Sequence, residues 1–362
     1  MIIMDVKFNH VYGFDNFNIN FAYPRKLSAS LLGNETLEGR KRFRYKKAVV
    51  LMGTNASGKT SLGRALLKVF SSIKEANDAI LREIETGNER AEFQVDFVNE
   101  GYTLHRFKGV ISGDDVNTMY YSAEIGEMDS YEMAVEKLVN RTDEYDGDFK
   151  KLRNLIGHIE VRFAYPEIET SLRVNDVKKN VLLDTLRAVI GTLDPTLTDV
   201  SIAKDLKNSF VIRRREQEII IQEGKLLNRE LLSSGTAEGI DVAVFLASML
   251  SGKNCFYYCD EHFSYIQSDI EKRIFGMMAE RLGANEQLIF TTHNTDMLDL
   301  NLPKHSFAFI RKDIEDDKYI VSVVFASDIL KRNTDSVRCA LENDVFDTLP
   351  DDSLLDELEV RQ

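Results

Sequence analysis

Hydrophobic and polar residues alternate along the first part of the chain, in the runs MDVKFNHVYGF and NFNINFAY. Alternation with a period of two is typical of β-strands that bury one face. Two further runs of this kind, AEFQVDFV and YTLHRFKGV, are separated by NEG, which favours a hairpin turn. This pattern predicts an N-terminal antiparallel β subdomain.

A different pattern begins at residues 48–52, a short run that is apolar throughout and ends at Gly53. Residues 60–73 follow with helical spacing, and from Leu231 onward helical and strand-like stretches alternate. The expected elements there are a helix at 237–250, a strand at 255–259, a helix at 268–282, a strand at 287–291, and the strands SFAFIRK and KYIVSVVFAS. Strands that alternate with helices predict an α/β fold with a mainly parallel central sheet.

The middle of the chain, residues 130–229, has apolar residues at helical spacing, as at Val181, Leu182, Leu186 and Val189. We therefore expect one α/β head built from residues 1–129 and 230–362, with a helical lobe inserted between its halves. Within the lobe, IRRREQEIII is expected to be a strand. The acidic tail beyond Glu342 is expected to be partly helical at DDSLLDELEV. It has three interpretations: a solvated segment, a segment that repels DNA from one face, or a site for a basic partner.

Composition narrows the class of protein. The 362 residues are 43% hydrophobic and 29% charged, as in ordinary globular proteins. No apolar run reaches the ~20 residues of a membrane span, and no signal peptide is visible, so we expect a cytoplasmic protein without a membrane partner. Cys255 and Cys259 lie in an apolar run and are expected to be reduced core residues, with Cys339 also free. The net charge of −13 argues against a surface coated for nonspecific nucleic-acid binding, although local basic patches remain.

The segment VVLMGTNASGKTSL matches the phosphate-loop pattern G-x-x-x-x-G-K-[ST] and stands between a predicted strand and a predicted helix. Its glycines let the backbone approach phosphate oxygens closely, and the helix N-terminus adds partial positive charge. Lys59 is expected to reach the β and γ phosphates, and the Thr60 hydroxyl to bind Mg²⁺. The expected nucleotide-binding residues of this loop are Gly53, Asn55, Gly58, Lys59, Thr60 and Ser61.

Two later strands end in chemically useful side chains. Asp260 and Glu261 follow the apolar run of NCFYYCDEH, and His293 follows that of QLIFTTHNTD. In a parallel sheet these strand ends meet at one edge, where ligands bind. Asp260 is then expected to hold Mg²⁺, Glu261 to polarise the attacking water, and His293 to contact the γ phosphate or that water. Taken alone, an Asp-Glu pair also occurs as a solvated strand end, and a histidine as a packing residue.

The stretch LLSSGTAEGI begins the predicted helix at 237 with more small polar residues than a helix cap requires. Ser233, Ser234 and Gly235 leave room for a phosphate beside a hydroxyl and a bare backbone amide. We interpret them as a second phosphate contact.

The order of these motifs resembles that of the ABC-type ATPase superfamily, in which Leu232 to Thr236 falls at the L-S-G-G-Q signature. More narrowly, GTNASGKTS, SSGT and TTHNTDML resemble the ATPase heads of the RecF, SMC and OLD group. They are most similar to the compact AAA family ATPases of bacterial phage-defence and abortive-infection operons. The resemblance covers residues 1–75 and 231–300 but not the middle of the chain.

The resemblance implies ATP and Mg²⁺ as cofactors, Lys59 and Thr60 as phosphate and metal ligands, and Asp260 as the metal-site acid. It implies Glu261 as catalytic base and His293 as switch histidine. Ser233 and Gly235 match the signature residues that contact the γ phosphate held by the opposite subunit, so a homodimer is implied. Because too few residues follow the histidine strand for an OLD-type nuclease, a nuclease or toxin effector is expected on another chain.

The chain departs from the family pattern at three positions. His262 replaces the proline after Asp-Glu, Ser234 replaces the first signature glycine, and Thr236 replaces the signature glutamine. Gln94 is a weak candidate for the family's glutamine loop and fits a plain strand residue better. These departures put the catalytic rate in question more than ATP binding.

The basic stretch RKRFRYKK, residues 40–47, has three interpretations. Phe43 or Tyr45 stacks on adenine beside a cation, or the stretch grips a nucleic-acid backbone while its aromatic rings stack on bases. The third interpretation is a solvated charged loop.

The sequence therefore favours an ABC-type ATPase that dimerises around ATP and acts as a switch for a partner effector, in anti-phage defence. The alternatives are a DNA repair or chromosome-maintenance ATPase that binds DNA directly, and a nucleotide-binding scaffold with negligible turnover.

Overall fold

A computed structural model of the chain describes residues 1–23, 32–33, 35–84, 90–165, 177–197, 199–203, 206, 209–214, 217–222, 225–227, 229–315, 318–332 and 334–348. Its central sheet has the strand order β10-β15-β16-β5-β17-β18. The strands are β10 (Val161–Ala164), β15 (Phe256–Asp260), β16 (Gln287–Thr291), β5 (Ala48–Met52), β17 (Phe307–Glu315) and β18 (Lys318–Phe325). All of them run parallel except β18, which forms a hairpin with β17. The predicted mainly parallel α/β sheet is confirmed.

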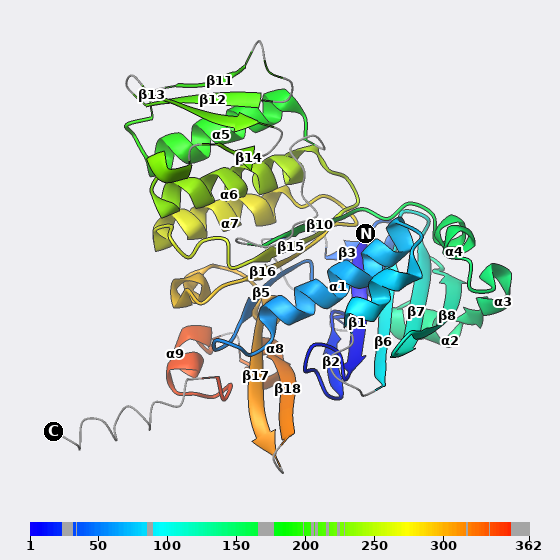
Figure 1. The fold of residues 1–362 in the computed structure, drawn as a ribbon. Helices are drawn as coiled ribbons and strands as arrows, with labels where there is room; N and C mark the ends of the chain where they lie inside the picture. The colour runs from blue at the N-terminus through cyan, green and yellow to red at the C-terminus, as the bar shows by residue number, and fades with distance from the viewer. Residues whose placement is uncertain are drawn as a thin grey trace.

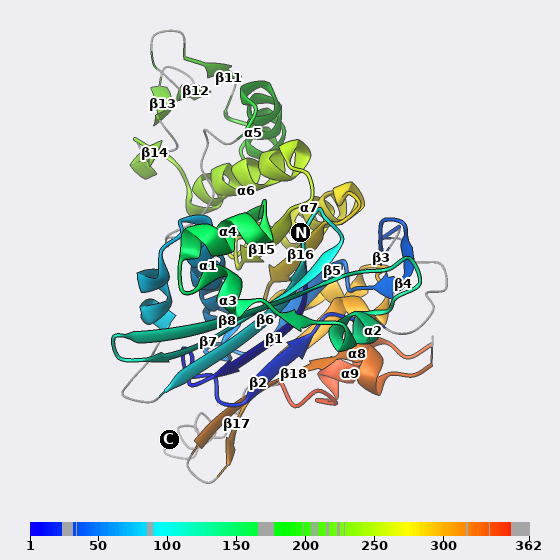
Figure 2. The same cartoon turned by 90° about the vertical axis from the view of Figure 1, so that its right-hand side faces the viewer.

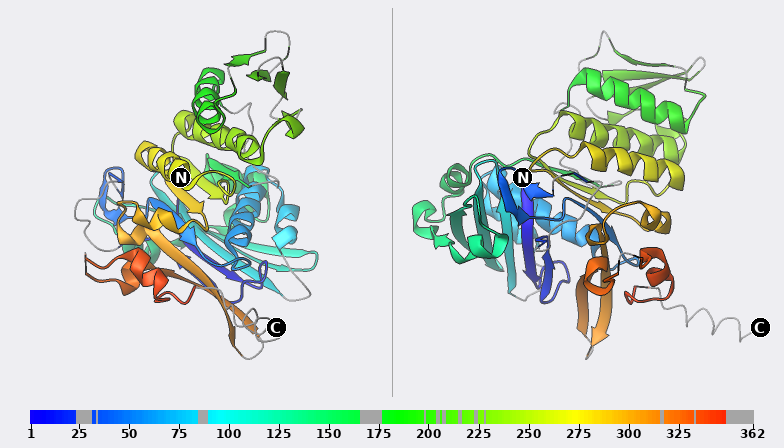
Figure 3. Two further views of the ribbon diagram at one scale, coloured as in Figure 1. Left: turned by 90° about the vertical axis from the view of Figure 1, so that its left-hand side faces the viewer. Right: turned by 180° about the vertical axis from the view of Figure 1, so that it is seen from behind.

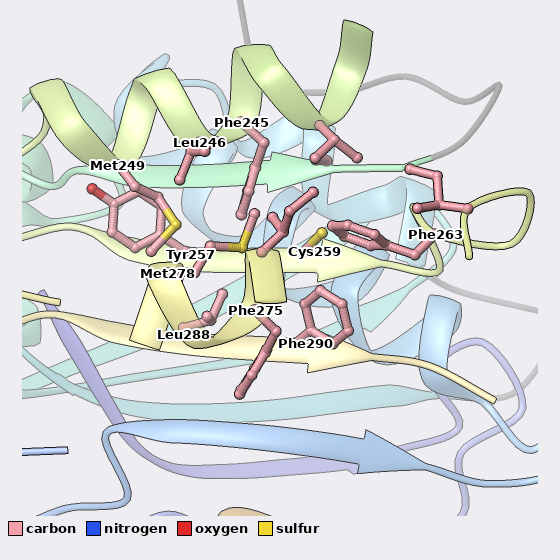
Figure 4. Close-up of a cluster of buried hydrophobic side chains, with 14 of the residues drawn as sticks. Phe245, Leu246, Met249, Tyr257, Cys259, Phe263, Phe275, Met278, Leu288 and Phe290 are labelled. Carbon is pink, nitrogen blue, oxygen red and sulfur yellow. The ribbon is translucent and has the colours of Figure 1, made fainter. Parts of the chain in front are cut away.

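Both faces of the central sheet are covered, because its strands are apolar at successive positions and alternate side chains point to opposite sides. In β5, Ala48, Val50 and Met52 contribute to one buried cluster and Val49 and Leu51 to another. Helices α6 (Ser234–Ser251) and α7 (Ser268–Arg281) cover the first face, and α1 (Lys59–Lys74) covers the second (Figure 1). Figure 4 shows Phe245 and Met249 of α6 and Phe275 of α7 among side chains of β15 and β16.

The N-terminal antiparallel subdomain is also present. Its strand order is β2-β1-β6-β7-β8-β9. The strands are β1 (Ile2–Asn9), β2 (Phe17–Asn20), β6 (Ala91–Val98), β7 (Thr103–Ser112), β8 (Asp115–Glu124) and β9 (Val139–Asn140). The sheet lies on the same side of the central sheet as α1, with which it shares a core (Figure 2).

The middle of the chain contains strands as well as the expected helices. Its helices are α2 (Tyr131–Glu136), α3 (Thr142–Tyr145), α4 (Phe149–Ile156) and α5 (Lys179–Leu193). Strands β11 (Asp199–Ile202), β12 (Ser209–Arg214), β13 (Gln217–Gln222) and β14 (Lys225–Leu226) form a separate antiparallel sheet beside α5 (Figure 1). The segment IRRREQEIII was expected to be one strand, but it contributes to two antiparallel strands, β12 and β13. β10 belongs to the central sheet, so the segment 130–229 is not purely helical, and its division from the head at these residues stays a prediction.

The remaining elements are short and lie around the head (Figure 3). They are β3 (Thr36–Leu37), β4 (Arg40–Arg44), α8 (Ala326–Ile329), α9 (Val337–Glu342) and the 3₁₀ turns η1 (Asp78–Ile84), η3 (Arg229–Leu231), η4 (Thr295–Asp299) and η5 (Lys304–Ser306). Cys255 and Cys259 are buried and free, as expected, and Cys339 is free and exposed. The stretch DDSLLDELEV lies outside the described residues. Among the helices that are described, none combines the length and apolar character needed to cross a bilayer.

A glycine in α1 tests how tightly this helix packs on the central sheet, and a glycine in α5 serves as the control. A Cβ atom at Gly63 of α1 would lie 2.5 Å from a ring carbon of Tyr258 and 2.6 Å from the Tyr165 hydroxyl. We therefore expect Gly63→Ala to lower the free energy of unfolding by about 1–3 kcal/mol, because the ring of Tyr258 is fully buried. Gly191→Ala in α5 meets nothing within 4 Å and should be neutral or stabilising. Denaturant unfolding measures both, and equal effects would contradict the close packing of α1.

Candidate functional site

Three segments far apart in the sequence meet at the C-terminal edge of the central sheet. Parallel register pairs Asp260 of β15 with Thr291 of β16, and Thr291 with Leu51 of β5. The residues that follow these strands are therefore neighbours: the loop 53–58, Glu261, and His293. The sequence prediction that these strand ends share one edge is confirmed.

The loop after β5 is tightly wrapped. Ala56 and Gly58 have positive φ angles of 61° and 109°. A side chain at Gly58 would lie 2.9 Å from the ring of Phe14, which follows β1, and a side chain at Gly53 would collide with the backbone of Ile310. Neither position tolerates a Cβ atom, so both motif glycines are required by this backbone.

Hydrogen-bond donors line the interior of this loop. Lys59 is almost fully buried, and its Nζ donates to the carbonyls of Gly53 at 3.0 Å and Thr54 at 3.1 Å. The buried Ser57 hydroxyl has no partner within the described residues. Together with the free backbone amides at the start of α1, these groups form a cradle that fits a phosphate.

Asn55 and Ser61 occupy different parts of this region. Asn55 is exposed at the tip of the loop and lines a cavity of about 550 Å³ together with Gly53, Thr54 and His293. Ser61 lies half-buried in the first turn of α1, directly after Thr60.

Asp260 is held by two hydroxyls. Thr60 Oγ1 donates to its Oδ2 at 2.6 Å, and Thr291 Oγ1 donates to its Oδ1 at 2.7 Å. Burial raises the pKa of Asp260, and the two hydroxyl donors oppose that rise. Among the described residues there is no cluster of three or more His, Cys, Asp or Glu side chains for a metal. Thr60 and Asp260 nevertheless fit a Mg²⁺ ion that takes its other ligands from phosphates and water.

Glu261 is oriented differently from its neighbour because its backbone leaves the strand. Its φ is +47°, in the left-handed region that few residues other than glycine occupy. Its backbone N–H donates to Thr291 Oγ1 at 3.0 Å. Its Oε1 lies 2.9 Å from His293 Nε2 and 3.2 Å from Lys59 Nζ. The hydrogen bond from His293, and next the charge of Lys59, hold the pKa of Glu261 below its ordinary value, against the effect of partial burial.

The segment Ser233–Thr236 begins helix α6. Ser233 is its N-cap and accepts from Thr236 N at 3.2 Å, while its hydroxyl lies 2.7 Å from Thr236 Oγ1. Ser233 and Ser234 are exposed and Gly235 is half-buried. Within the described part of the chain, the hydrogen bonds of Ser233 stay within α6, so within one subunit Ser233 makes no hydrogen bond to the phosphate loop 53–58.

Some structurally important residues around the site had no assigned role in the sequence analysis. Thr291 links Asp260 to the backbone of Glu261, and Phe14 packs against the phosphate loop. The aromatic residue in the turn VYGFDN was the available signal for Phe14. His262, which replaces the family's proline, is buried, and burial lowers its pKa to about 4, so its ring is neutral at pH 7.

The basic stretch 40–47 does not present aromatic rings to a ligand. Phe43 and Tyr45 are fully buried, and the Tyr45 hydroxyl donates to the Glu286 carbonyl at 3.2 Å. Lys46 is also buried, with its Nζ over the ring of Phe325. The expectation that Phe43 or Tyr45 stacks on adenine or on bases is therefore wrong, because the side chains of Phe43 in β4 and of Tyr45 just after it are buried in the protein core. Gln94 lies within β6, opposite Lys7 and Lys108 of the adjacent strands, as a plain strand residue does.

Comparison with known proteins identifies the fold. No protein-family model matches the sequence, and no curated protein matches it significantly. Among solved structures, the chain is similar to an Smc head bound to the C-terminal winged-helix domain of ScpA. That match has a TM-score of 0.51 and 14% identity and covers 91% of this chain and 100% of the other.

A second match is the Smc head of Pyrococcus furiosus, which has an extended coiled coil and is bound to the C-terminal domain of ScpA. It has a TM-score of 0.50 and 12% identity and covers 90% of this chain and 97% of the other. The chain has the fold of an SMC head. This is the ABC-type ATPase fold, in agreement with the resemblance noted in the sequence.

The ionised state of Glu261 makes a prediction about pH. A carboxyl whose pKa is lowered in the folded state stabilises the protein above its unfolded pKa and loses that effect as the pH falls through the folded value. We expect Glu261→Gln to destabilise the protein at neutral pH, and the difference from wild type to shrink as the pH falls below the ordinary value of 4.5. Urea unfolding at several pH values measures this difference. Glu280→Gln, at an exposed position of α7, controls for the loss of one negative charge, and a pH-independent difference for Glu261→Gln would contradict the assigned contacts.

Proposed function

We propose that this protein is a Mg²⁺-dependent ATPase that dimerises around ATP and acts as a switch controlling a separate effector protein. The observation that carries the proposal is the convergence of Lys59, Glu261 and His293 beside the Thr60–Asp260 pair. The distances of 3.2 Å and 2.9 Å from Glu261 to the lysine and the histidine bring an ionised base and two donors together at one sheet edge. The fold shared with SMC heads supports the same class of activity.

The proposed roles follow from this geometry. The loop 53–58 and Lys59 hold the β and γ phosphates of ATP, with Asn55 and Ser61 at the margins of that site. A bound Mg²⁺ neutralises phosphate charge, and Thr60 and Asp260 hold it. Glu261, kept ionised by its neighbours, accepts a proton from the attacking water, and His293 orients the water or donates to the γ phosphate.

The contacts of Lys59 include groups that a phosphate can replace. Its amine donates to two carbonyls of its own loop and pairs with Glu261. A γ phosphate is a stronger partner for an ammonium group than a neutral carbonyl. In the proposed ATP complex, Lys59 exchanges its bonds to the two carbonyls for a bond to the γ phosphate.

The dimer is proposed because Ser233 and Ser234 are exposed and Ser233 makes no hydrogen bond to the phosphate loop of its own subunit within the described residues. A helix N-terminus with small residues in front is a ready anion site. In the dimer, Ser233, Ser234 and Gly235 of each subunit contact the γ phosphate bound by the other, and hydrolysis releases the pair. The two matched Smc heads are each bound to part of ScpA, a separate protein, which is consistent with control of a partner. An effector that is a nuclease or toxin in anti-phage defence follows from the sequence resemblance alone.

The direct test uses the variant Glu261→Gln. Without the base, ATP should persist and the variant should form a stable dimer with saturating ATP and Mg²⁺, measured by size-exclusion chromatography with light scattering. The double variant Lys59→Ala/Glu261→Gln is the matched control and should remain monomeric, because it lacks the lysine that holds the phosphates. A Glu261→Gln protein that stays monomeric under these conditions would falsify the ATP-dependent dimer.

The rate of ATP hydrolysis distinguishes the proposed ATPase from the alternative of a nucleotide-binding scaffold with negligible turnover. We expect the wild type to release inorganic phosphate from ATP, and Lys59→Ala to reduce the rate by about 100-fold or more, since it removes phosphate positioning and charge stabilisation together. Phosphate release is measured at saturating ATP with Mg²⁺. Equal rates for the two proteins would favour a nucleotide-binding scaffold.

A further inference from the structure

A buried glutamate joins the start of α6 to the loop that follows Glu261. Glu238 lies in the second turn of α6 and is 8% exposed. Its Oε1 accepts from Ser264 N at 3.2 Å and its Oε2 accepts from Tyr265 N at 2.8 Å. Among the described residues it has no ion-pair partner, so these two backbone N–H groups are its main compensation for burial.

The loop 262–266 makes a second contact with α6. A Cβ atom at Gly235 would lie 2.7 Å from the carbonyl oxygen of Tyr265. That neighbour is backbone, so the loop itself would have to move to accommodate a side chain. Gly235 and Glu238 are three residues apart and lie on one face of the helix. The loop is thus fixed to α6 at two successive points.

The same loop is connected to Glu261. Ser264 Oγ donates to the Glu261 carbonyl at 3.0 Å. On its other side, Glu261 N donates to Thr291. Because the left-handed conformation of Glu261 is unfavourable for a residue with a side chain, it persists only where neighbouring contacts determine it. Ser264 supplies one of those contacts, and Glu238 holds the backbone of Ser264.

We propose that Glu238 is a positioning residue that couples the Ser233–Gly235 segment to the orientation of Glu261. This inference rests on the proposed function, in which that segment contacts the partner's ATP. Engagement of the segment by the partner's phosphate then orders Glu261 in the same subunit, and each nucleotide promotes hydrolysis of the other. The path runs from α6 to the loop 262–266 through the Gly235–Tyr265 contact and the two hydrogen bonds of Glu238, and from that loop to Glu261 through the Ser264 hydroxyl.

Glu271 of α7 supplies a matched comparison. It is 2% exposed and accepts from Thr292 Oγ1 at 2.7 Å and from Asn294 Nδ2 at 2.6 Å, the two residues that flank His293. It is therefore a buried glutamate that holds the second catalytic loop. None of its hydrogen bonds within the described residues involves α6 or the loop 262–266. Replacing it disturbs the site without breaking the proposed link.

The first experiment is hydrogen–deuterium exchange on the nucleotide-free protein, because this readout does not depend on ATP hydrolysis. Glu238→Gln places an amide donor where a carboxylate oxygen accepted, so we expect faster exchange in peptides covering 261–266 and also in 233–238. Glu271→Gln should accelerate exchange at 292–294 and leave 233–238 unchanged. Gly235→Ala is the second variant: it displaces the same loop from its other contact and should accelerate exchange at 262–266 while Glu238 stays intact.

The second experiment is ATPase kinetics with the full chain. For Glu238→Gln we expect kcat to fall by about 10- to 100-fold, as for a small displacement of a catalytic group. The affinity for a fluorescent ATP analogue should be unchanged, and any Hill coefficient above 1 in the wild type should fall to 1. Glu238→Asp keeps both oxygens and should recover part of the rate. Glu271→Gln should lower kcat but retain the wild-type Hill coefficient.

These experiments test the proposed function and the coupling through Glu238 separately. A wild type that neither hydrolyses ATP nor dimerises defeats the proposed function, and exchange data still decide whether Glu238 links α6 to Glu261. If exchange in Glu238→Gln changes only at Ser264 and Tyr265, with 233–238 and Glu261 as in wild type, the coupling is overturned. A Glu238→Gln enzyme with wild-type kcat and Hill coefficient overturns it as well.

Discussion

The two hydrogen bonds that Asp260 accepts hold the site together. Thr60 belongs to the phosphate loop's helix and Thr291 to the neighbouring strand, and both donate to one buried carboxylate, at 2.6 Å and 2.7 Å. A carboxylate removed from water requires such partners, so breaking either bond leaves a poorly compensated charge in the core. The same bonds place α1, β15 and β16 in one relative position. All other features of the candidate site are built on that position.

In this arrangement the adjacent carboxyl groups of Asp260 and Glu261 differ in orientation and in the direction of their pKa shifts. Asp260 points into the protein, and burial raises its pKa; Glu261 turns out of the strand, and His293 and Lys59 lower its pKa. The sequence predicts different roles for them, and the alternation of side chains along a strand would already direct the two carboxyl groups to different sides. The structure shows a further cause of their different orientations. The left-handed backbone of Glu261 ends the strand and redirects its side chain toward the phosphate loop. One residue is thereby suited to hold a metal and the other to act on water.

The sequence predicted the head well because its strands and helices have strong, unmixed patterns. Residues 48–52 are apolar throughout and 288–290 form a continuous apolar run, and β5 and β16 occupy those positions. The strands of the middle segment were harder to predict, because β10 is only four residues long and belongs to a sheet whose other strands lie far away in the sequence. The burial of Phe43 was missed for a related reason: strand β4 alternates, and its charged residues suggested a solvated or ligand-binding segment. Tertiary packing determines whether β10 joins the central sheet and whether Phe43 is buried. Local sequence does not encode that packing.

Glu238 shows the same limit at a functional site. In the sequence it is one acidic residue in the first half of a helix, where acidic residues are common and usually solvated. Its importance comes from the loop 262–266, which returns to α6 after the β15 strand and brings two backbone N–H groups to its carboxylate. Helix α5 also packs closely against α6: a Cβ atom at Gly239, the residue after Glu238, would lie 2.3 Å from a side-chain carbon of Leu193. Helix α6 therefore contacts the middle segment on one face and the Glu261 loop through Glu238. A partner that displaced α5 would act on the same helix that holds the Glu261 loop, so the fold would give the proposed partner protein a mechanical route to the proposed catalytic base.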